Sequence, residues 1–318
     1  MPYRPGSFKF IGMAVCWSFA ALASAQTPGN MRDASSPPAT GREFRFYVVP
    51  ADANGPYSEY PAAIYNSGLA FISNHPVEGP VKRINPVAAG FDRLYFSPIG
   101  EDGSLLPPVF IPVEVSLGRL IHAGPACIFA NGAEAVVTLT IDEKSQGLPG
   151  PKLFRARIAQ KRWIVEEKLF AGQEGAFSHP FLDEDNNVIY FVSDRPGGFG
   201  GTDIYFCRIG ETDIQNAGPA INTPGNEMFP FINSDGFLYF TSDGRDGHGG
   251  MDLFRAACQN VGFAAPVNLG PEINSAANEF AIVFDRYGSR GYFCSDRDGQ
   301  PAIYHFYLSK LDSGDKGE

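Results

Sequence analysis

The chain has 318 residues, of which 44% are hydrophobic and 13% aromatic, enough for one large β domain or two smaller domains. Its 36 glycines and 26 prolines follow no collagen-like period and suit a fold with many turns. The net charge is −10 and no basic stripe is visible, so we do not expect nucleic acid as a partner.

The first 25 residues have the features of a signal peptide. Arg4 and Lys9 form a positive region, residues 10–22 form an apolar stretch, and Ala23-Ser24-Ala25 is a small-residue cleavage site. The apolar stretch is short for a membrane span, so we expect no transmembrane span after cleavage. We predict an exported protein, located in the periplasm, on the periplasmic side of the outer membrane, or secreted.

The rest of the chain divides into a linker, one large domain and a tail. Residues 26–43 are rich in Pro, Ser and Gly and are predicted to be a disordered linker. Residues 44–310 show many short strands and no convincing amphipathic helix, and residues 311–318 form a C-terminal tail.

The chain contains two similar Gly-rich stretches, SDRPGGFGG at 193–201 and SDGRDGHGG at 242–250. Each follows a short aromatic strand and precedes another apolar run. A phosphate-binding loop would have to open a helix, but the runs that follow, DIYF and DLF, are typical of strands. A loop repeated at a fixed spacing indicates a repeat architecture instead.

Five copies of one unit can be aligned, beginning near Glu59, Gly124, Ser178, Glu227 and Asn278; the last two steps are 49 and 51 residues. The two N-terminal copies are the most divergent. Each copy provides about four strands, and residues 188–192 (VIYFV) are apolar on both faces, as in a strand covered on both sides. This pattern predicts an all-β fold, a β-propeller of five four-stranded blades. A sixth blade would fit if the long 60–122 region held an extra unit.

The two ends of the repeat region predict how the ring closes. The fifth copy stops after its third strand, near Leu308, whereas residues 44–50 precede the first copy without a unit of their own. We predict that residues 44–50 supply the outer strand of the last blade, because pairing both ends in one blade removes open edges.

The cysteines are predicted to be buried free thiols. Cys127, Cys207, Cys258 and Cys294 lie in apolar strand-like runs and show no C-x-x-C spacing. Export would permit disulfides, and the sequence leaves their pairing open. We expect no zinc site and no cofactor. Cys16 fits a lipidation site poorly, because the residue before it is not small.

The stretches SDRPGGFGGTDIYF, INTPGNEMFPFI, LYFTSDGRDGHGGMDLF, PVNLGPEIN and GYFCSDRDG resemble the WD40-like β-propeller repeats of bacterial envelope proteins. Relatives of this kind include the TolB propeller of the Tol-Pal system and the propeller of OmpA-family proteins of the PorE type. The resemblance covers about residues 60–308, most strongly from residue 177. It implies an envelope location and a protein partner.

Larger members of this group carry a helical repeat region before the propeller and a peptidoglycan-binding domain after it. This chain ends at Glu318, soon after the last repeat. We therefore expect a free-standing propeller and do not carry over the wall-anchoring role, although peptidoglycan or another glycan stays an alternative partner.

Ten polar residues are candidates for a binding site at one face of the ring. The loops before each first strand and those between second and third strands share a face, where we expect a mostly acidic mouth. The candidates are Glu59, His122, His179, Arg195, Asp203, Glu227, Asp243, His248, Asp252 and Glu279. The competing interpretation is structural: Ser-Asp at a strand end can bond its own backbone, and the arginines follow repeat positions.

An enzyme is the less favoured interpretation. A glycosidase needs two carboxylates at a set separation, and nothing in the sequence singles out such a pair. Neither a G-x-S-x-G nor an H-E-x-x-H motif is present. We therefore assign no catalytic or metal-binding residue. The sequence favours an exported, non-catalytic propeller scaffold that binds a protein or peptide in the cell envelope. The alternatives are a carbohydrate-active or metal-dependent hydrolase with an axial pocket, and a purely structural subunit bound through the blade sides.

Overall fold

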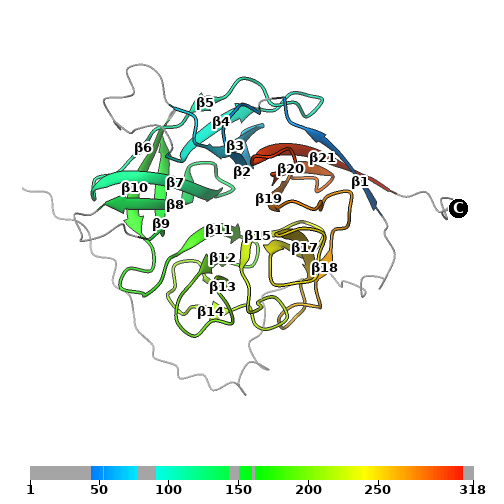
Figure 1. The fold of residues 1–318 in the computed structure, drawn as a ribbon. Coiled ribbons are helices and arrows are strands. Elements are labelled where there is room, and N and C mark those ends of the chain that lie inside the picture. Colours follow the sequence, from blue (N-terminus) through cyan, green and yellow to red (C-terminus); the bar gives the residue numbers. More distant parts are fainter. Residues whose placement is uncertain (1–43, 53, 77–90, 143–149, 160–161, 311–318) are drawn as a thin grey trace, which may run out of the picture. The chain divides into compact units, whose positions relative to one another are not determined.

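The computed structural model describes residues 44–52, 54–76, 91–142, 150–159 and 162–310, and these form strands, turns and loops without a helix. Five sheets surround a central axis as the blades of a β-propeller, as predicted (Figure 1). The expected signal peptide (1–25), linker (26–43) and tail (311–318) lie outside the described residues. Within those limits, no helix has the length and apolarity needed to cross a membrane.

The strands of each blade are given from the inner strand outward. Blade 1 holds β2 (Glu59–Tyr65), β3 (Gly68–Ser73), β4 (Arg93–Pro98) and β5 (Val109–Phe110). Blade 2 holds β7 (Arg119–Ile128), β8 (Glu134–Asp142), β9 (Lys152–Ala159), β10 (Arg162–Lys168) and, parallel to β10, β6 (Val113–Glu114). Blade 3 holds β11 (Ser178–Asp183), β12 (Val188–Ser193), β13 (Asp203–Arg208) and β14 (Gln215–Asn216). Blade 4 holds β15 (Glu227–Ile232), β16 (Phe237–Ser242), β17 (Asp252–Ala257) and β18 (Val267–Asn268). Blade 5 holds β19 (Glu279–Phe284), β20 (Arg290–Ser295), β21 (Ala302–Lys310) and β1 (Phe44–Pro50).

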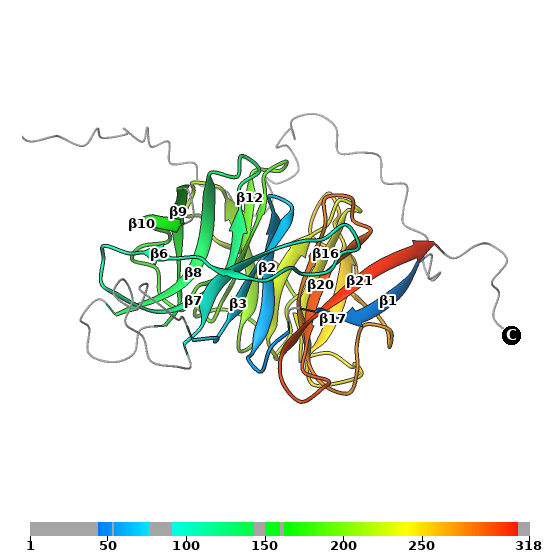
Figure 2. The same cartoon turned by 90° about the horizontal axis from the view of Figure 1, so that it is seen from above.

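Strand β1 closes the ring. It pairs antiparallel with β21 along its whole length, from Phe44 opposite Lys310 to Pro50 opposite Tyr304. Figure 2 shows the two strands, one from each end of the propeller sequence, running side by side. The prediction that residues 44–50 complete the last blade is confirmed.

The core consists of five apolar clusters, each between two neighbouring blades. Strand β12 shows why the strands are apolar on both faces. Ile189 and Phe191 pack toward blade 2, whereas Tyr190 and Val192 pack toward blade 4. Burial of apolar area on both sides of every sheet is therefore what holds the blades together.

The repeat copies begin where the inner strands begin, except in blade 2. Strand β7 starts at Arg119, five residues before the predicted Gly124, and has two register shifts against β8. The bulges obscure the repeat at this point. Strand β6 also comes before β7 in the chain but lies at the outer edge of blade 2, which the repeat pattern did not predict.

The ring has two distinct faces, which we name by their connections. The loop face carries the starts of the inner strands and the loops between second and third strands, including the two Gly-rich loops. The turn face carries the ends of the inner strands and the turns that follow them, at residues 66–67, 129–133, 184–187, 233–236 and 285–289.

Candidate functional site

The glutamates predicted as binding candidates, Glu59, Glu227 and Glu279, begin inner strands and lie in the junctions between blades. Glu227 is fully buried and accepts hydrogen bonds from the backbone nitrogen and the hydroxyl of Thr223, both at 2.7 Å, and from Ser242 Oγ at 2.6 Å. Glu279 repeats the arrangement in the next junction, with Ser275, Ser295 and Arg297. Each carboxylate thus holds the start of an inner strand to the connection that precedes it.

Glu59 occupies the same position where blade 5 meets blade 1. Its carboxylate accepts from the backbone nitrogen of Gly55 at 3.4 Å and from Ser73 Oγ at 3.2 Å. Burial raises the pKa of the Glu59 carboxyl, against the opposing effect of these hydrogen bonds.

An asparagine accompanies each of these three glutamates, five residues before it. The asparagine amide exchanges two hydrogen bonds with the backbone of a third strand in the preceding blade. The pairs are Asn222 with Ile204, Asn274 with Leu253, and Asn54 with Ile303. We call this arrangement of asparagine and glutamate the junction latch.

Asp203 and Asp252 hold the Gly-rich loops in shape. Asp203 accepts from the backbone nitrogens of Phe199 at 2.6 Å and Gly200 at 3.2 Å. Asp252 accepts in the same way from His248 at 2.5 Å and Gly249 at 3.0 Å. Both aspartates are at most 2% exposed, so their oxygens face the loop backbone.

The glycines let these loops lie against the next blade connection. A Cβ on Gly200 would lie 2.2 Å from the carbonyl oxygen of Gly225, and one on Gly249 would lie 1.9 Å from that of Ala277. Both distances are far below van der Waals contact. The loops are therefore longer than a tight turn because they dock on the neighbouring connection.

Asp243 and Arg195 also make contacts within the fold. Asp243 accepts from the backbone and side-chain nitrogens of Asn226, at 2.6 and 2.8 Å. The Arg195 guanidinium lies over the Tyr205 ring, 5.7 Å from its centroid, and donates to Gln173 Oε1 at 3.3 Å. These contacts are those expected of residues with a structural role. A binding role for either residue stays a prediction.

The three candidate histidines have different surroundings. His248 is an exposed residue of its Gly-rich loop. His122 lies beside Asp92, with Nδ1 3.5 Å from the carboxylate, and against the ring of Phe91. His179 lies on the axis and is the one candidate that lines the axial cavity within the described part of the chain.

Four ring side chains close the axis near the loop face. Phe229 lies 3.9 Å from His179, 6.2 Å from Tyr60 and 5.4 Å from Phe280, measured between ring centroids. The four residues come from the beginnings of the inner strands of blades 1, 3, 4 and 5, and we call them the aromatic plug. Edge-on and tilted packing of this kind is favourable for aromatic rings.

Beyond the plug, the axis opens into a cavity of about 830 Å³ that leads to the turn face. All five inner strands line it. Its deep walls carry Phe181 and Phe231, whose rings lie 4.9 Å apart, and its outer part is formed by the turns after the inner strands. The volume falls within the range of about 300–1,000 Å³ that is typical of ligand pockets.

The mouth of the cavity is polar. Arg290 donates to Asp285 at 3.1 Å and to the carbonyl of Glu101 at 3.4 Å, which fixes it across the junction of blades 5 and 1. Arg286 and Tyr287 project beside them, with 66% of Tyr287 exposed. The remaining polar groups of the mouth come from Asn66, Ser67, Asn233 and Ser234.

Apart from His179, the residues that line the cavity were not predicted from the sequence, although the sequence contains a signal for them. The inner strands EYPAAIY, SHPFLD and EMFPFI carry Pro61, Pro180 and Pro230, and all three line the cavity. Because proline cannot donate to a sheet ladder, it is confined to edges and bulges. Proline within the first strand of a repeat unit therefore marks the strand whose free edge faces the axis.

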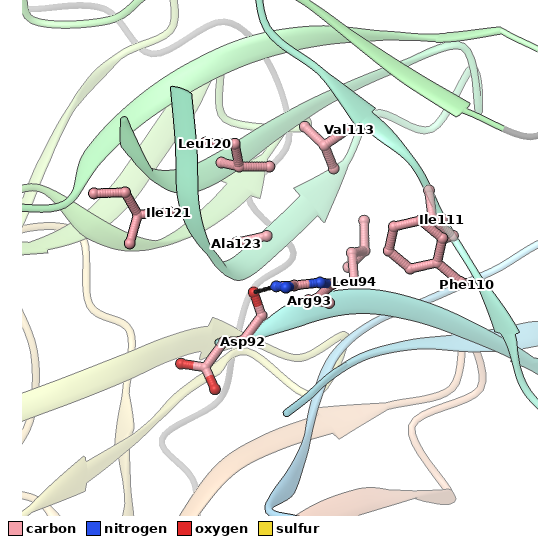
Figure 3. A pocket seen from close by; sticks show the side chains of 9 residues that line it. All are labelled: Asp92, Arg93, Leu94, Phe110, Ile111, Val113, Leu120, Ile121 and Ala123. Atoms are coloured by element: carbon pink, nitrogen blue, oxygen red, sulfur yellow. Dashed lines mark hydrogen bonds between the residues drawn. The ribbon is translucent and has the colours of Figure 1, made fainter. Parts of the chain in front are cut away.

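A second, much smaller space lies between blades 1 and 2 (Figure 3). It measures about 10 Å³ and is lined by residues including Leu94, Ile111 and Leu120, with Asp92 and Arg93 at one side. That is room for one water molecule at most, so it is a packing gap and not a ligand site.

Neither a metal cluster nor a disulfide is found within the described ranges. No group of three or more His, Cys, Asp or Glu side chains there could hold a metal ion. Cys127, Cys207, Cys258 and Cys294 are free thiols, and burial raises the pKa of Cys207 to about 12 and that of Cys258 to about 11.

Comparison with known proteins assigns the chain to no family. No family model matches the chain, and no curated protein matches it. Among solved structures, a thermostable family-43 glycoside hydrolase has a TM-score of 0.49 at 13% identity, covering 85% of this chain and 96% of its own. A putative TolB from Agrobacterium tumefaciens has a TM-score of 0.47 at 11% identity, covering 85% and 99%. A putative exo-β-1,3-galactanase from Bifidobacterium bifidum has a TM-score of 0.49 at 14% identity, covering 80% and 91%.

These similarities are too low to indicate an activity, and they include enzymes as well as a TolB. The fold and the site define a five-bladed β-propeller with an axial cavity that is closed at the loop face and open at the turn face. Membership of the WD40-like envelope repeat family stays a prediction.

Proposed function

We propose that this protein is a non-catalytic scaffold of the bacterial cell envelope that binds an extended segment of a protein partner in its axial cavity. The observation that carries the proposal is the cavity itself, which is large enough for several side chains, apolar at depth and polar at its mouth. An apolar interior with a few convergent polar groups is the usual character of a ligand site.

The backbone of the inner strands supports a peptide as the ligand. Each inner strand pairs with a neighbour on one side only, so its other edge faces the axis. Edge strands offer unpaired N–H and C=O groups that can bond an extended chain. Pro61, Pro125, Pro180 and Pro230 each remove a donor at one point of an inner strand, on four of the five, which leaves carbonyl groups to accept from the peptide.

The lining gives less support to the alternative, a carbohydrate-active or metal-dependent hydrolase. Its described carboxylates are those of Glu101 and Asp285, both at the mouth. Asp285 is paired with Arg290 and accepts from the backbone nitrogens of Tyr287 and Ser289, each at 3.2 Å. A glycosidase needs a second carboxyl group facing the first across the scissile bond.

The test compares two tryptophan variants in which an exposed side chain is enlarged on opposite faces. Ser234→Trp obstructs the cavity mouth, and Asp246→Trp alters a Gly-rich loop of the loop face. The full chain would be expressed and purified after any processing by the cell. It would then be used to capture partners from envelope extract, with quantification by mass spectrometry.

We expect a partner that binds the wild type and Asp246→Trp and is lost with Ser234→Trp. Loss with Asp246→Trp alone would move the site to the loop face, where the sequence analysis predicted it. Retention by both variants would favour binding through the blade sides. Turnover of a glycan or lactone substrate that Ser234→Trp abolishes would favour the hydrolase.

A further inference from the structure

His179 occupies a backbone position that recurs in three blades. His179, Phe229 and Ala281 each follow the start of an inner strand, at a bulge where the register with the second strand shifts. All three have left-handed backbone conformations, with φ of 49°, 53° and 56°. The fold therefore accepts a phenylalanine or an alanine here, and nothing in the backbone requires a histidine.

The imidazole has one ring nitrogen engaged and one left for a ligand. Nδ1 lies 2.9 Å from the hydroxyl of Ser178, and the backbone nitrogen donates to Thr138 Oγ1 at 3.1 Å. Nε2 has no partner among the described residues, and the side chain lines the cavity. His179 is thus the polar group of the cavity floor, set against the ring of Phe229.

The state of the imidazole sets what its free nitrogen can offer a ligand. Burial lowers the pKa of His179 to about 3, so the ring is neutral at physiological pH. A neutral imidazole has one donor and one acceptor nitrogen, and the Ser178 hydroxyl can pair with either tautomer. A group that both donates and accepts would therefore bond Nε2 in both cases, and a hydroxyl does so.

The walls near His179 restrict the ligand further. They are formed by Phe181, Phe229 and Phe231 together with Pro180 and Pro230. A sugar ring placed there would bury several hydroxyls against one polar partner, and each unpaired buried hydroxyl is costly. A phenol buries one hydroxyl and one aromatic ring, which matches the single imidazole and the surrounding rings.

We propose that His179 is a specificity-determining residue that selects a tyrosine side chain in the bound segment by hydrogen bonding its hydroxyl through Nε2. This inference rests on the proposed peptide-binding function and adds the residue type that enters the cavity. A site built to bond a hydroxyl discriminates strongly against the analogue without it, because the site's polar group is then left unpaired.

The test uses N-acetyl-L-tyrosinamide and N-acetyl-L-phenylalaninamide as probes of the full chain, with affinities measured by NMR titration. The variants are His179→Phe and His179→Ala, which copy the residues of blades 4 and 5, and circular dichroism verifies their fold. We expect tyrosinamide to bind the wild type at least tenfold more tightly than phenylalaninamide. In both variants the ratio should fall to about one or below.

The other outcomes separate the two proposals. Equal binding of both probes that Ser234→Trp abolishes would overturn the role of His179 and leave the cavity as a peptide site. A tyrosine preference that persists in His179→Phe would likewise overturn it. If Ser234→Trp leaves partner capture intact while neither probe binds, the proposed function and the inference fail together.

Discussion

The side-chain amide of Asn54 and the backbone of Ile303 exchange two hydrogen bonds, at 2.7 and 2.9 Å, across 249 residues of sequence. The same pair of bonds joins Asn222 to Ile204 and Asn274 to Leu253 within the ring. The junction between blades 5 and 1, which closes the ring, therefore has the same hydrogen bonds as the junctions between blades 3 and 4 and between blades 4 and 5.

We expect Asn54→Ala to lower the free energy of unfolding by about 1–3 kcal/mol, because it leaves the buried N–H of Ile303 without a partner, while the Ile303 carbonyl keeps the hydrogen bond from the backbone nitrogen of Ala51. Urea denaturation measures the change. Asn222→Ala should cost about as much, whereas Asn186→Ala, in an exposed turn, should cost less than about 0.5 kcal/mol. A loss at Asn54 no larger than at Asn186 would show that β1–β21 pairing alone holds the ring closed.

Gly249→Ala should destabilise the protein by about 3 kcal/mol or more. Its new Cβ would lie 1.9 Å from the carbonyl oxygen of Ala277, so the loop or the connection must move. The matched variant is Gly172→Ala, where no atom lies within 4 Å and only the φ of 83° opposes a side chain, at about 1–2 kcal/mol. Similar midpoints of thermal unfolding for the two variants would contradict the docking of the Gly-rich loop.

Glu227→Gln should reduce stability and leave partner binding unchanged. The amide places an NH₂ group against donors of Thr223 or Ser242, at a cost of about 2 kcal/mol. The side chain does not line the cavity. Unfolding curves and partner affinity under native conditions are measured together, with exposed Glu174→Gln as the control. A fall in affinity with stability intact would restore Glu227 as a binding residue of the loop face.

Acid should destabilise the wild type more than His179→Phe. The folded pKa of His179 is about 3, below the value of about 6.5 in an unfolded chain, so the unfolded state binds the extra proton between these values. Stability from this residue is complete above about pH 6.5 and is lost as the pH falls toward 3. Between pH 7 and pH 5, the stability gap between the two proteins should shift by about 2 kcal/mol. Parallel stability profiles would show that the imidazole is hydrated.

The repeats made the fold predictable, because each of the last three copies brings its own aromatic strand and Ser-Asp end. Residues 44–50 could be assigned to the last blade by aligning the stretch before Glu59 with the stretch before Glu279, and that alignment also sets Asn54 against Asn274. The roles of these asparagines were not predicted, because a single asparagine in a connection usually indicates a turn.

The site was harder to predict than the fold. The sequence placed the polar residues at the loop face, as the structure does, but the depth of each side chain depends on bulges that sequence periodicity does not reveal. Phe229 and His179 turn inward because their backbones are left-handed. Glycine or asparagine in the sequence would indicate such a conformation, whereas phenylalanine and histidine do not. The cavity therefore opens at the turn face, whereas the site was predicted at the loop face.

The pairing of Phe44 with Lys310 has a consequence for how this molecule can be rebuilt. The two ends of the propeller sequence meet at one point of one sheet, so a short linker could join them into a circle. New ends could then be cut at a loop of another blade, such as the one at residues 243–251. The order in which the blades are synthesised would change while every neighbour stayed the same.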